Sequence, residues 1–216
     1  MRAGADWLVK LHHASGVFPF PVGPGLHPGE KVGHIVARAI KEHPEMVVND
    51  WIPDDRTDGG LQFDNGLCGR ALLSAWELTK DARYLDAAVR KADIGVLPGQ
   101  MPAGRSFDAH NASAVYHNIL LRELLELFHA LPDDHTFRMT LLDALTRGLN
   151  QAADETLAKG CTGTWTDNFA RGLQWIGENK KWRDALHANL NASGRNGAPT
   201  PGFAILAVLE GIQPAP

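Results

Sequence analysis

Aspartates placed beside predicted helix starts are the first residues with the spacing for acid–base chemistry. Asp64 and Asp108 lie in the similar segments FDNG (63–66) and FDAH (107–110), and Asp58 lies upstream beside two glycines. Hydrolysis of a glycosidic bond needs two carboxyl groups, one protonated and one ionised. A helix N-terminus lowers the pKa of a nearby carboxylate, so Asp64 and Asp108 suit a base or nucleophile better than an acid. The alternative is that these aspartates cap helices or lie in a solvated loop.

A second polar group surrounds the start of the predicted helix 109–131. His110 and His117 are seven residues apart, so a helix places them on one face, and Asn111 and Tyr116 are their neighbours. An Asn, a His and a Tyr that converge on a uronic acid can neutralise its carboxylate, abstract a proton and return one. That is the chemistry of a polysaccharide lyase. The alternatives are contacts to sugar hydroxyls, or histidines buried in the core.

Two tryptophans complete the candidate site. Trp51 and Trp165 fall in or beside predicted loops, where an indole ring can stack on a sugar face. Exposed aromatic side chains are also common without any function. The full set of predicted substrate contacts is Trp51, Asn65, His110, Asn111, Tyr116, His117 and Trp165.

Other catalytic templates are absent from the sequence or fit poorly. Residues 54–58 match the DDxxD string that holds magnesium diphosphate in terpene synthases, but Pro53 and the glycines that follow do not fit its helix. No GxGxxG, P-loop, HExxH or GxSxG pattern occurs. The two cysteines are too few for a disulfide scaffold or a four-thiolate zinc site. We therefore expect neither a metal nor a cofactor.

Composition bounds the class of protein. The chain has 216 residues, 44% of them apolar and 21% charged, which is typical of one globular domain spanning 1–216. No apolar run is long enough to span a bilayer, and a net charge of −4 does not favour nucleic acid. The first residues lack the apolar run of a signal peptide, so we expect a cytoplasmic or already processed chain.

The elements that must position these residues are helices. Residues 46–65 are irregular, whereas apolar residues recur at helical spacing through most of the chain, so the sequence predicts an all-α protein. The predicted helices are 3–13, 30–42, 66–79, 82–95, 109–131, 134–158, 167–178, 181–191 and 201–212.

These helices alternate between two kinds. Helices 66–79 and 109–131 are apolar nearly all round, each with one polar stripe at positions i, i+4 and i+7, whereas helices 82–95 and 134–158 have one core-facing side. The stripes consist of Arg70, Ser74 and Glu77 in the first inner helix and Arg122, Glu126 and His129 in the second. The pattern predicts an α/α hairpin repeat in which inner helices run the same way and gather their N-termini at one end.

The segments FDNGL (63–67) and ALLSAWELTKDARYLDAA (71–88) resemble a sequence motif that recurs in the helical hairpins of α/α-toroid, or six-hairpin glycosidase-like, carbohydrate-active enzymes. The resemblance covers about residues 3–160 and implies an (α/α) toroid with a site at its mouth. Glycoside hydrolases, polysaccharide lyases, epimerases and terpene cyclases share this architecture, so the resemblance is specific for the fold rather than for one reaction.

A complete toroid of this kind has six hairpins, and this chain supplies about four. We therefore expect a partial toroid, which is either a minimal or incomplete ring, a fragment of a longer protein, or a ring that a second copy of the chain completes. The predicted function is glycoside hydrolysis by carboxylates drawn from Asp58, Asp64 and Asp108. The alternatives are a polysaccharide lyase using His110 or His117 with Tyr116, and a non-catalytic helical-repeat binding module.

Overall fold

Helices dominate the part of the chain that the computed structural model describes, namely residues 2–11, 62–100, 102–104, 114–159, 165–194 and 209–210. Seven α-helices lie in these ranges, and no β-strand does. The prediction of an all-α protein is therefore confirmed for the described ranges. The predicted helix 30–42 and nearly all of 201–212 lie outside them.

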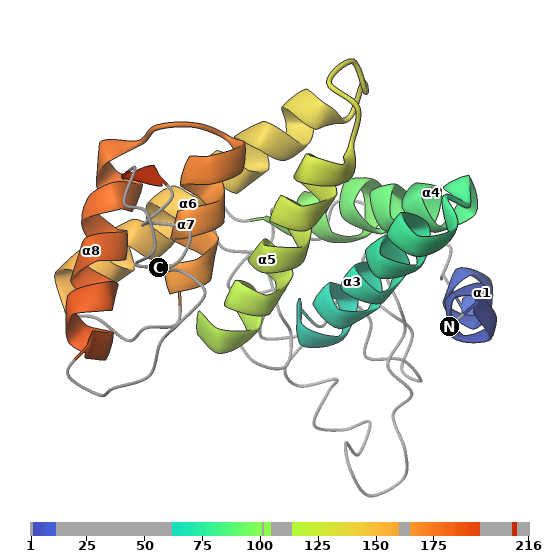
Figure 1. The fold of residues 1–216 in the computed structure, drawn as a ribbon, viewed down its shortest axis with the longest axis horizontal. Helices are drawn as coiled ribbons and strands as arrows, with labels where there is room; N and C mark the ends of the chain where they lie inside the picture. Colours follow the sequence, from blue (N-terminus) through green and yellow to red (C-terminus); the bar gives the residue numbers. More distant parts are fainter. Residues whose placement is uncertain are drawn as a thin grey trace, which may run out of the picture.

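The helices cross the molecule in approximately their chain order, from α1 at one end to α8 at the other (Figure 1). Their bounds are Arg2–Leu11 (α1), Gln62–Thr79 (α3), Ala82–Arg90 (α4), Ala114–Ala130 (α5), Arg138–Lys159 (α6), Thr166–Trp175 (α7) and Lys180–Gly194 (α8). A π-helix, Lys91–Val96, and a short 3-10 helix, Leu97–Gly99, continue α4. No described helix has both the length and the apolar composition needed to cross a membrane.

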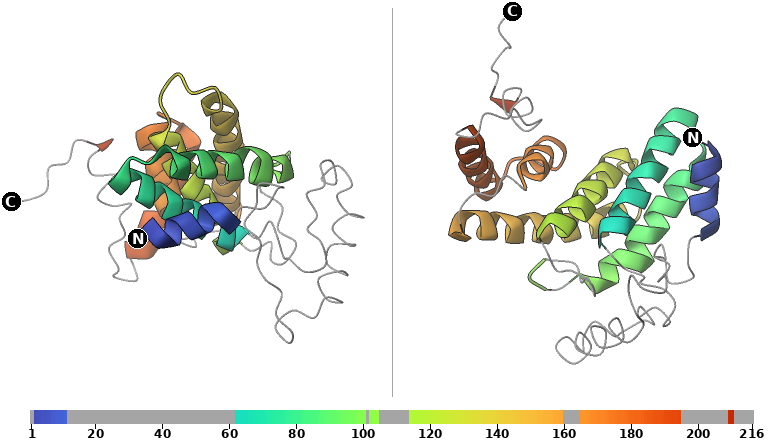
Figure 2. Two further views of the ribbon diagram at one scale, coloured as in Figure 1. Left: turned by 90° about the vertical axis from the view of Figure 1, so that its right-hand side faces the viewer. Right: turned by 90° about the horizontal axis from the view of Figure 1, so that it is seen from below.

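Three helices form a row through the middle of the molecule. Helix α3 lies against α5, and α5 lies against α7. We call α3, α5 and α7 the central row. Helix α4 packs on α3, α6 packs on α5, and α8 packs on both α6 and α7. Helix α1 packs on α3 and α4 at the edge of the molecule, as the view from below in Figure 2 shows.

Close contacts show that α3 and α5 run parallel. A Cβ atom added to Gly66 would lie 3.0 Å from Ile119, and one added to Gly69 would lie 2.4 Å from Glu123. Contacts therefore advance along both helices in the same direction. The two glycines allow this close approach because they carry no side chain at the interface.

Helices α5 and α7 also run parallel. Asn168 Nδ2 donates hydrogen bonds to the backbone oxygen (3.0 Å) and side-chain oxygen (2.7 Å) of Asn118, near the start of both helices. Near their ends, the His129 ring stacks on Trp175 with 4.5 Å between ring centroids. All three helices of the central row therefore begin at the same end of the molecule.

Burial distinguishes α5 from α6, whereas α3, which was predicted to be apolar nearly all round, exposes Leu67 and Leu78. Helix α5 contributes Leu120, Leu121, Leu124, Leu125 and Leu127 to the core, so most of its circumference is buried. Helix α6 instead buries side chains at helical spacing along one side, namely Leu141, Leu145, Leu149, Ala152 and Ala153.

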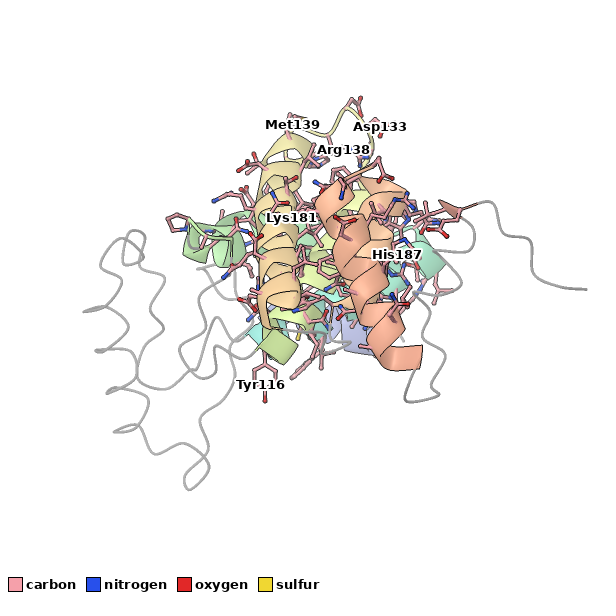
Figure 3. All side chains as sticks on the ribbon, turned by 90° about the vertical axis from the view of Figure 1, so that its left-hand side faces the viewer. Tyr116, Asp133, Arg138, Met139, Lys181 and His187 are labelled. Carbon is pink, nitrogen blue, oxygen red and sulfur yellow. The ribbon has the colours of Figure 1, made fainter. Side chains whose placement is uncertain are left out.

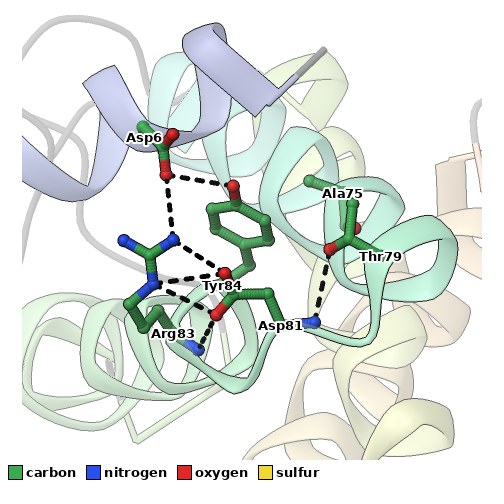
Figure 4. Close-up of polar contacts among 6 residues, drawn as sticks. All are labelled: Asp6, Ala75, Thr79, Asp81, Arg83 and Tyr84. Carbon is green, nitrogen blue, oxygen red and sulfur yellow. Dashed lines mark hydrogen bonds and ion pairs between the residues drawn. The ribbon is translucent and has the colours of Figure 1, made fainter.

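Side chains of the LTKDARYL segment (78–85) fix the turn between α3 and α4. Thr79 Oγ1 donates to the Ala75 carbonyl (2.7 Å) and accepts a bond from the Asp81 backbone N–H (3.3 Å). Asp81 in turn caps α4 by accepting from the backbone N–H of Arg83 (3.1 Å). These bonds satisfy backbone groups at a helix end and at a helix start, and thereby fix the turn (Figure 4).

The same segment anchors the N-terminal helix. The hydroxyl of buried Tyr84 donates to Asp6 Oδ1 at 3.0 Å, and Arg83 forms an ion pair with Asp6 at 3.3 Å (Figure 4). Helix α1 is therefore held against α4 across more than seventy residues of sequence.

Several predicted helix bounds are wrong, among them the end of α8, which lies at Gly194 instead of residue 191. Helix α3 begins at Gln62, not at residue 66, so Asp64 and Asn65 lie inside its first turn instead of preceding it. Helix α6 begins at Arg138, not at 134, because a turn closes first through bonds from His135 N–H to Pro132 O and from Arg138 N–H to His135 O. Helix α7 ends at Trp175 because Gly177 adopts φ +134°, a left-handed conformation that ends a helix.

Candidate functional site

The N-terminal end of the central row is where the sequence predicted the site. Among the predicted contacts, Asn65 lies in α3 and is fully buried, and Tyr116 lies near the start of α5 and is half-buried. Figure 3 shows Tyr116 at the opposite end of the helices from Asp133 and Met139, with its phenol pointing away from the ribbon. Tyr116 therefore offers its phenol at the predicted mouth.

His117 and Trp165 meet at this end. Their ring centroids are 5.5 Å apart with the planes at 71°, an edge-on contact. The His117 side chain is 3% exposed and that of Trp165 2%. Trp165 directly precedes α7 and packs against α5, so it serves the helix interface and presents no open ring face for a sugar.

The remaining predicted residues lie outside the described part of the chain. They are Trp51, Asp58, Asp108, His110 and Asn111. The backbone of Asp64 belongs to the first turn of α3, but its side chain also lies outside the described atoms.

A charge network crosses the central row about one to two turns further along. Glu126 accepts from Arg70 Nε (3.1 Å) on α3 and from Arg122 Nε (2.7 Å) on its own helix. Arg122 also donates through Nη1 to Asp167 Oδ2 on α7 at 3.1 Å. The Arg122 side chain is 18% exposed, so this network is partly shielded from water. It links all three helices through alternating charges.

Arg171 adds a third guanidinium to this region. It lies one turn beyond Asp167 on α7, half-buried, with its guanidinium carbon 4.7 Å from the Trp175 ring centroid. Its Nε is buried and lacks a hydrogen-bond acceptor among the described atoms. Burial lowers the pKa of the Arg171 guanidinium, and the positive charge of Arg122 lowers it further.

No family model matches this chain, and neither a curated protein nor a solved structure matches it. The side chains of the site are therefore the basis for its chemistry.

A buried ion pair lies behind the same part of α5. Lys91, the first residue of the π-helix, bonds to Glu123 through its ammonium group, and both side chains are 0% exposed. Burial raises the pKa of the Glu123 carboxyl, against the opposing effect of Lys91. Because neither side chain is exposed to solvent, the pair cannot contact a substrate. It instead holds the π-helix that continues α4 against α5.

Only some of these charged residues could be predicted from the sequence. The stripe of Arg122 and Glu126 was recognised, but its partners on α7 were not, because nothing in the sequence fixes which helix packs beside it. Lys91 had a detectable signal, since it lies seven residues after buried Tyr84 on the apolar face of a helix.

The described side chains define what the site can do. In those ranges, no group of three or more His, Cys, Asp or Glu side chains is arranged to hold a metal ion. The central row instead presents guanidinium and carboxylate groups beside aromatic rings. Such groups hydrogen-bond sugar hydroxyls and pair with anions.

Proposed function

We propose that this protein is a carbohydrate-active enzyme that hydrolyses a glycosidic bond at the N-terminal end of the central row. The observation that supports this proposal best is the shared direction of α3, α5 and α7. It brings the starts of three helices, which are far apart in the sequence, to one end of the molecule. Asp64 belongs to the first of these starts, and Asp108 precedes the second by six residues.

The architecture proposed with this function is a partial (α/α) toroid. The packing of α4 on α3, of α6 on α5 and of α8 on α7 supports successive hairpins. In this proposal the central row is the inner layer, and its polar stripe faces the substrate. A second copy of the chain would complete the missing part of the ring.

The proposed roles follow the chemistry of paired carboxyl groups. Two of Asp58, Asp64 and Asp108 act as the acid and as the base or nucleophile. Trp51, His110 and Asn111 orient the sugar. The buried pair of His117 and Trp165 supports the site from behind by holding α5 against the start of α7.

The test is hydrolysis by the wild type and by carboxyl variants. Release of reducing ends is measured on a panel of polysaccharides, and the active substrate is then used for D64N, D108N and D58N. Loss of an acid or base lowers the rate by about a hundredfold or more, so two of the three variants should lose activity. D86N is the matched control, because Asp86 is exposed on α4. Full activity in both D64N and D108N would refute the carboxylate assignment.

A lyase is the second candidate, and the placement of Tyr116 favours it. A half-buried phenol that points out at the mouth suits proton transfer, whereas buried His117 does not. A lyase forms an unsaturated uronide that absorbs ultraviolet light, and a hydrolase does not. Ultraviolet-absorbing products that disappear in Y116F would establish the lyase instead of the hydrolase.

A further inference from the structure

The three guanidinium groups of the central row outnumber the described carboxylates that pair with them, Glu126 and Asp167. Arg70 and Arg122 share the two oxygens of Glu126, and Arg122 also pairs with Asp167. These bonds join two arginines to two carboxylates. Arg171 forms no ion pair with any described carboxylate, and its charge is therefore in excess.

Charged groups and an aromatic ring surround the unbalanced positive charge of Arg171. The described groups whose charges act on it are Arg122, Glu126, Asp167 and Arg70, so both like and opposite charges are near. Its Nε is buried without an acceptor among the described atoms, so no described carboxylate or carbonyl satisfies this side of the guanidinium. The Trp175 ring fixes the guanidinium plane from one direction. An oxyanion placed beside the exposed part of the half-buried Arg171 guanidinium would balance the charge.

We propose that Arg171, with Arg122 and Arg70 beside it, binds an oxyanion carried by a saccharide, either a carboxylate or a sulfate. This inference rests on the proposed function, because it takes the saccharide to lie across the central row. An arginine fork matches the oxygen pair of such a group through two parallel hydrogen bonds. The substrate class is therefore an acidic glycan.

The competing explanation is that Arg171 only packs on Trp175. Arg147 provides a matched comparison, since its Nε is also buried without an acceptor but its guanidinium pairs with Asp143 at 3.0 Å. Arg147 belongs to α6, outside the central row. R171Q and R147Q thus remove the same charge from two arginines, of which Arg147 pairs with a described carboxylate and Arg171 does not.

The test is saccharide binding by calorimetry. The probes are trimers of galacturonate, glucuronate and mannuronate, sulfated maltotriose, and the neutral trimers made by reducing the carboxyl groups. Wild-type protein should bind an acidic trimer more tightly than its neutral counterpart, and added salt should weaken this preference. Comparing uronates with sulfated maltotriose identifies which oxyanion is bound.

The variants decide the role of Arg171. R171Q should weaken binding of the acidic trimer by about tenfold or more, and R147Q should not. R171K keeps the charge but loses the fork, so it should fall between R171Q and the wild type. If R171Q does not fold, the R171K affinity is decisive, and a wild-type value would overturn the proposal.

The outcomes separate this inference from the proposed function. Equal binding of acidic and neutral trimers, unchanged in R171Q, would overturn the oxyanion site and leave carbohydrate activity standing. A lower melting temperature of R171Q with unchanged acidic binding would assign Arg171 to packing alone. Absence of binding to any trimer, together with no turnover of polysaccharides, would overturn both proposals.

Discussion

Single glycines decide how closely α3 and α5 approach each other. Gly69 faces the carboxyl group of Glu123, and any Cβ there would lie 2.4 Å from Oε1. Glu123 and its ion-pair partner Lys91 are both 0% exposed, so a methyl group added to Gly69 would meet a carboxyl group that is already buried. A glycine is therefore required at position 69 because it has no side chain, not because its backbone is flexible.

We expect G69A to destabilise the protein by about 1–3 kcal/mol, because the added methyl group must displace a buried carboxyl or separate the helices. G4A is the matched control, since Gly4 lies in α1 with nothing within 4 Å of the added Cβ. G4A should be neutral or stabilising by up to about 1 kcal/mol through helix propensity. Urea unfolding measures both. An equal effect of the two substitutions would contradict the crowding argument.

At the scale of elements, the π-helix after α4 begins at the residue that pairs with Glu123. The regular helix extends only to Arg90, and Lys91 opens the wider turn. Removing one member of a buried ion pair leaves the other charge without compensation, which costs about 3–5 kcal/mol. We therefore expect K91M and E123Q each to be strongly destabilised. K91M combined with Glu123→Leu should recover most of the loss, because neither charge remains.

The pH dependence distinguishes the two single variants. In K91M the Glu123 carboxyl loses its cation, so its folded pKa rises further above the value of about 4.5 in an unfolded chain. A raised carboxyl pKa penalises folding above the unfolded pKa, and the penalty vanishes as pH falls to that value. The stability deficit of K91M relative to wild type should therefore shrink between pH 7 and about 4.5. The stability deficit of E123Q should not shrink over this range, because this variant has no carboxyl group at position 123. A pH-independent deficit in K91M would contradict this account.

The helices themselves could be predicted, and so could the end of α3 and the start of α4, but several other bounds and the side-chain contacts between helices could not. Apolar periodicity identified all seven described helices, because burial of one side or of the whole circumference repeats at 3.6 residues per turn. The start of α6 was missed because bonds across the 132–138 turn outweigh the weak preference of Asp133 and Asp134 for a helix start.

The site was less predictable than the fold. Asn65, Tyr116 and His117 were placed near the starts of helices by local sequence, but the burial of His117 depends on Trp165, almost fifty residues away. The partnership of Arg122 with Asp167 likewise spans 45 residues. Such contacts depend on which helices pack together, and periodicity does not encode that.

At the scale of the whole molecule, packing connects the helices from one end to the other. Helix α1 contacts α3 and α4, the central row links α3 to α7, and α8 packs on α6 and α7. The core is correspondingly continuous from Ala5 in α1 to Leu190 in α8. A continuous core of this kind favours a single cooperative unfolding unit rather than two smaller ones.

We therefore expect substitutions at opposite ends of the core to shift one common transition. Leu72 in α3 and Leu186 in α8 are both fully buried, so L72A and L186A should each cost about 2–5 kcal/mol. Calorimetry should give one peak in every case, with equal van't Hoff and calorimetric enthalpies. L78A is the control, because Leu78 is 68% exposed and should leave the peak in place. If L186A lowers one transition and leaves a second unchanged, α7 and α8 unfold independently of α3. The central row would then be the junction of two units, and the oxyanion site would lie where they meet.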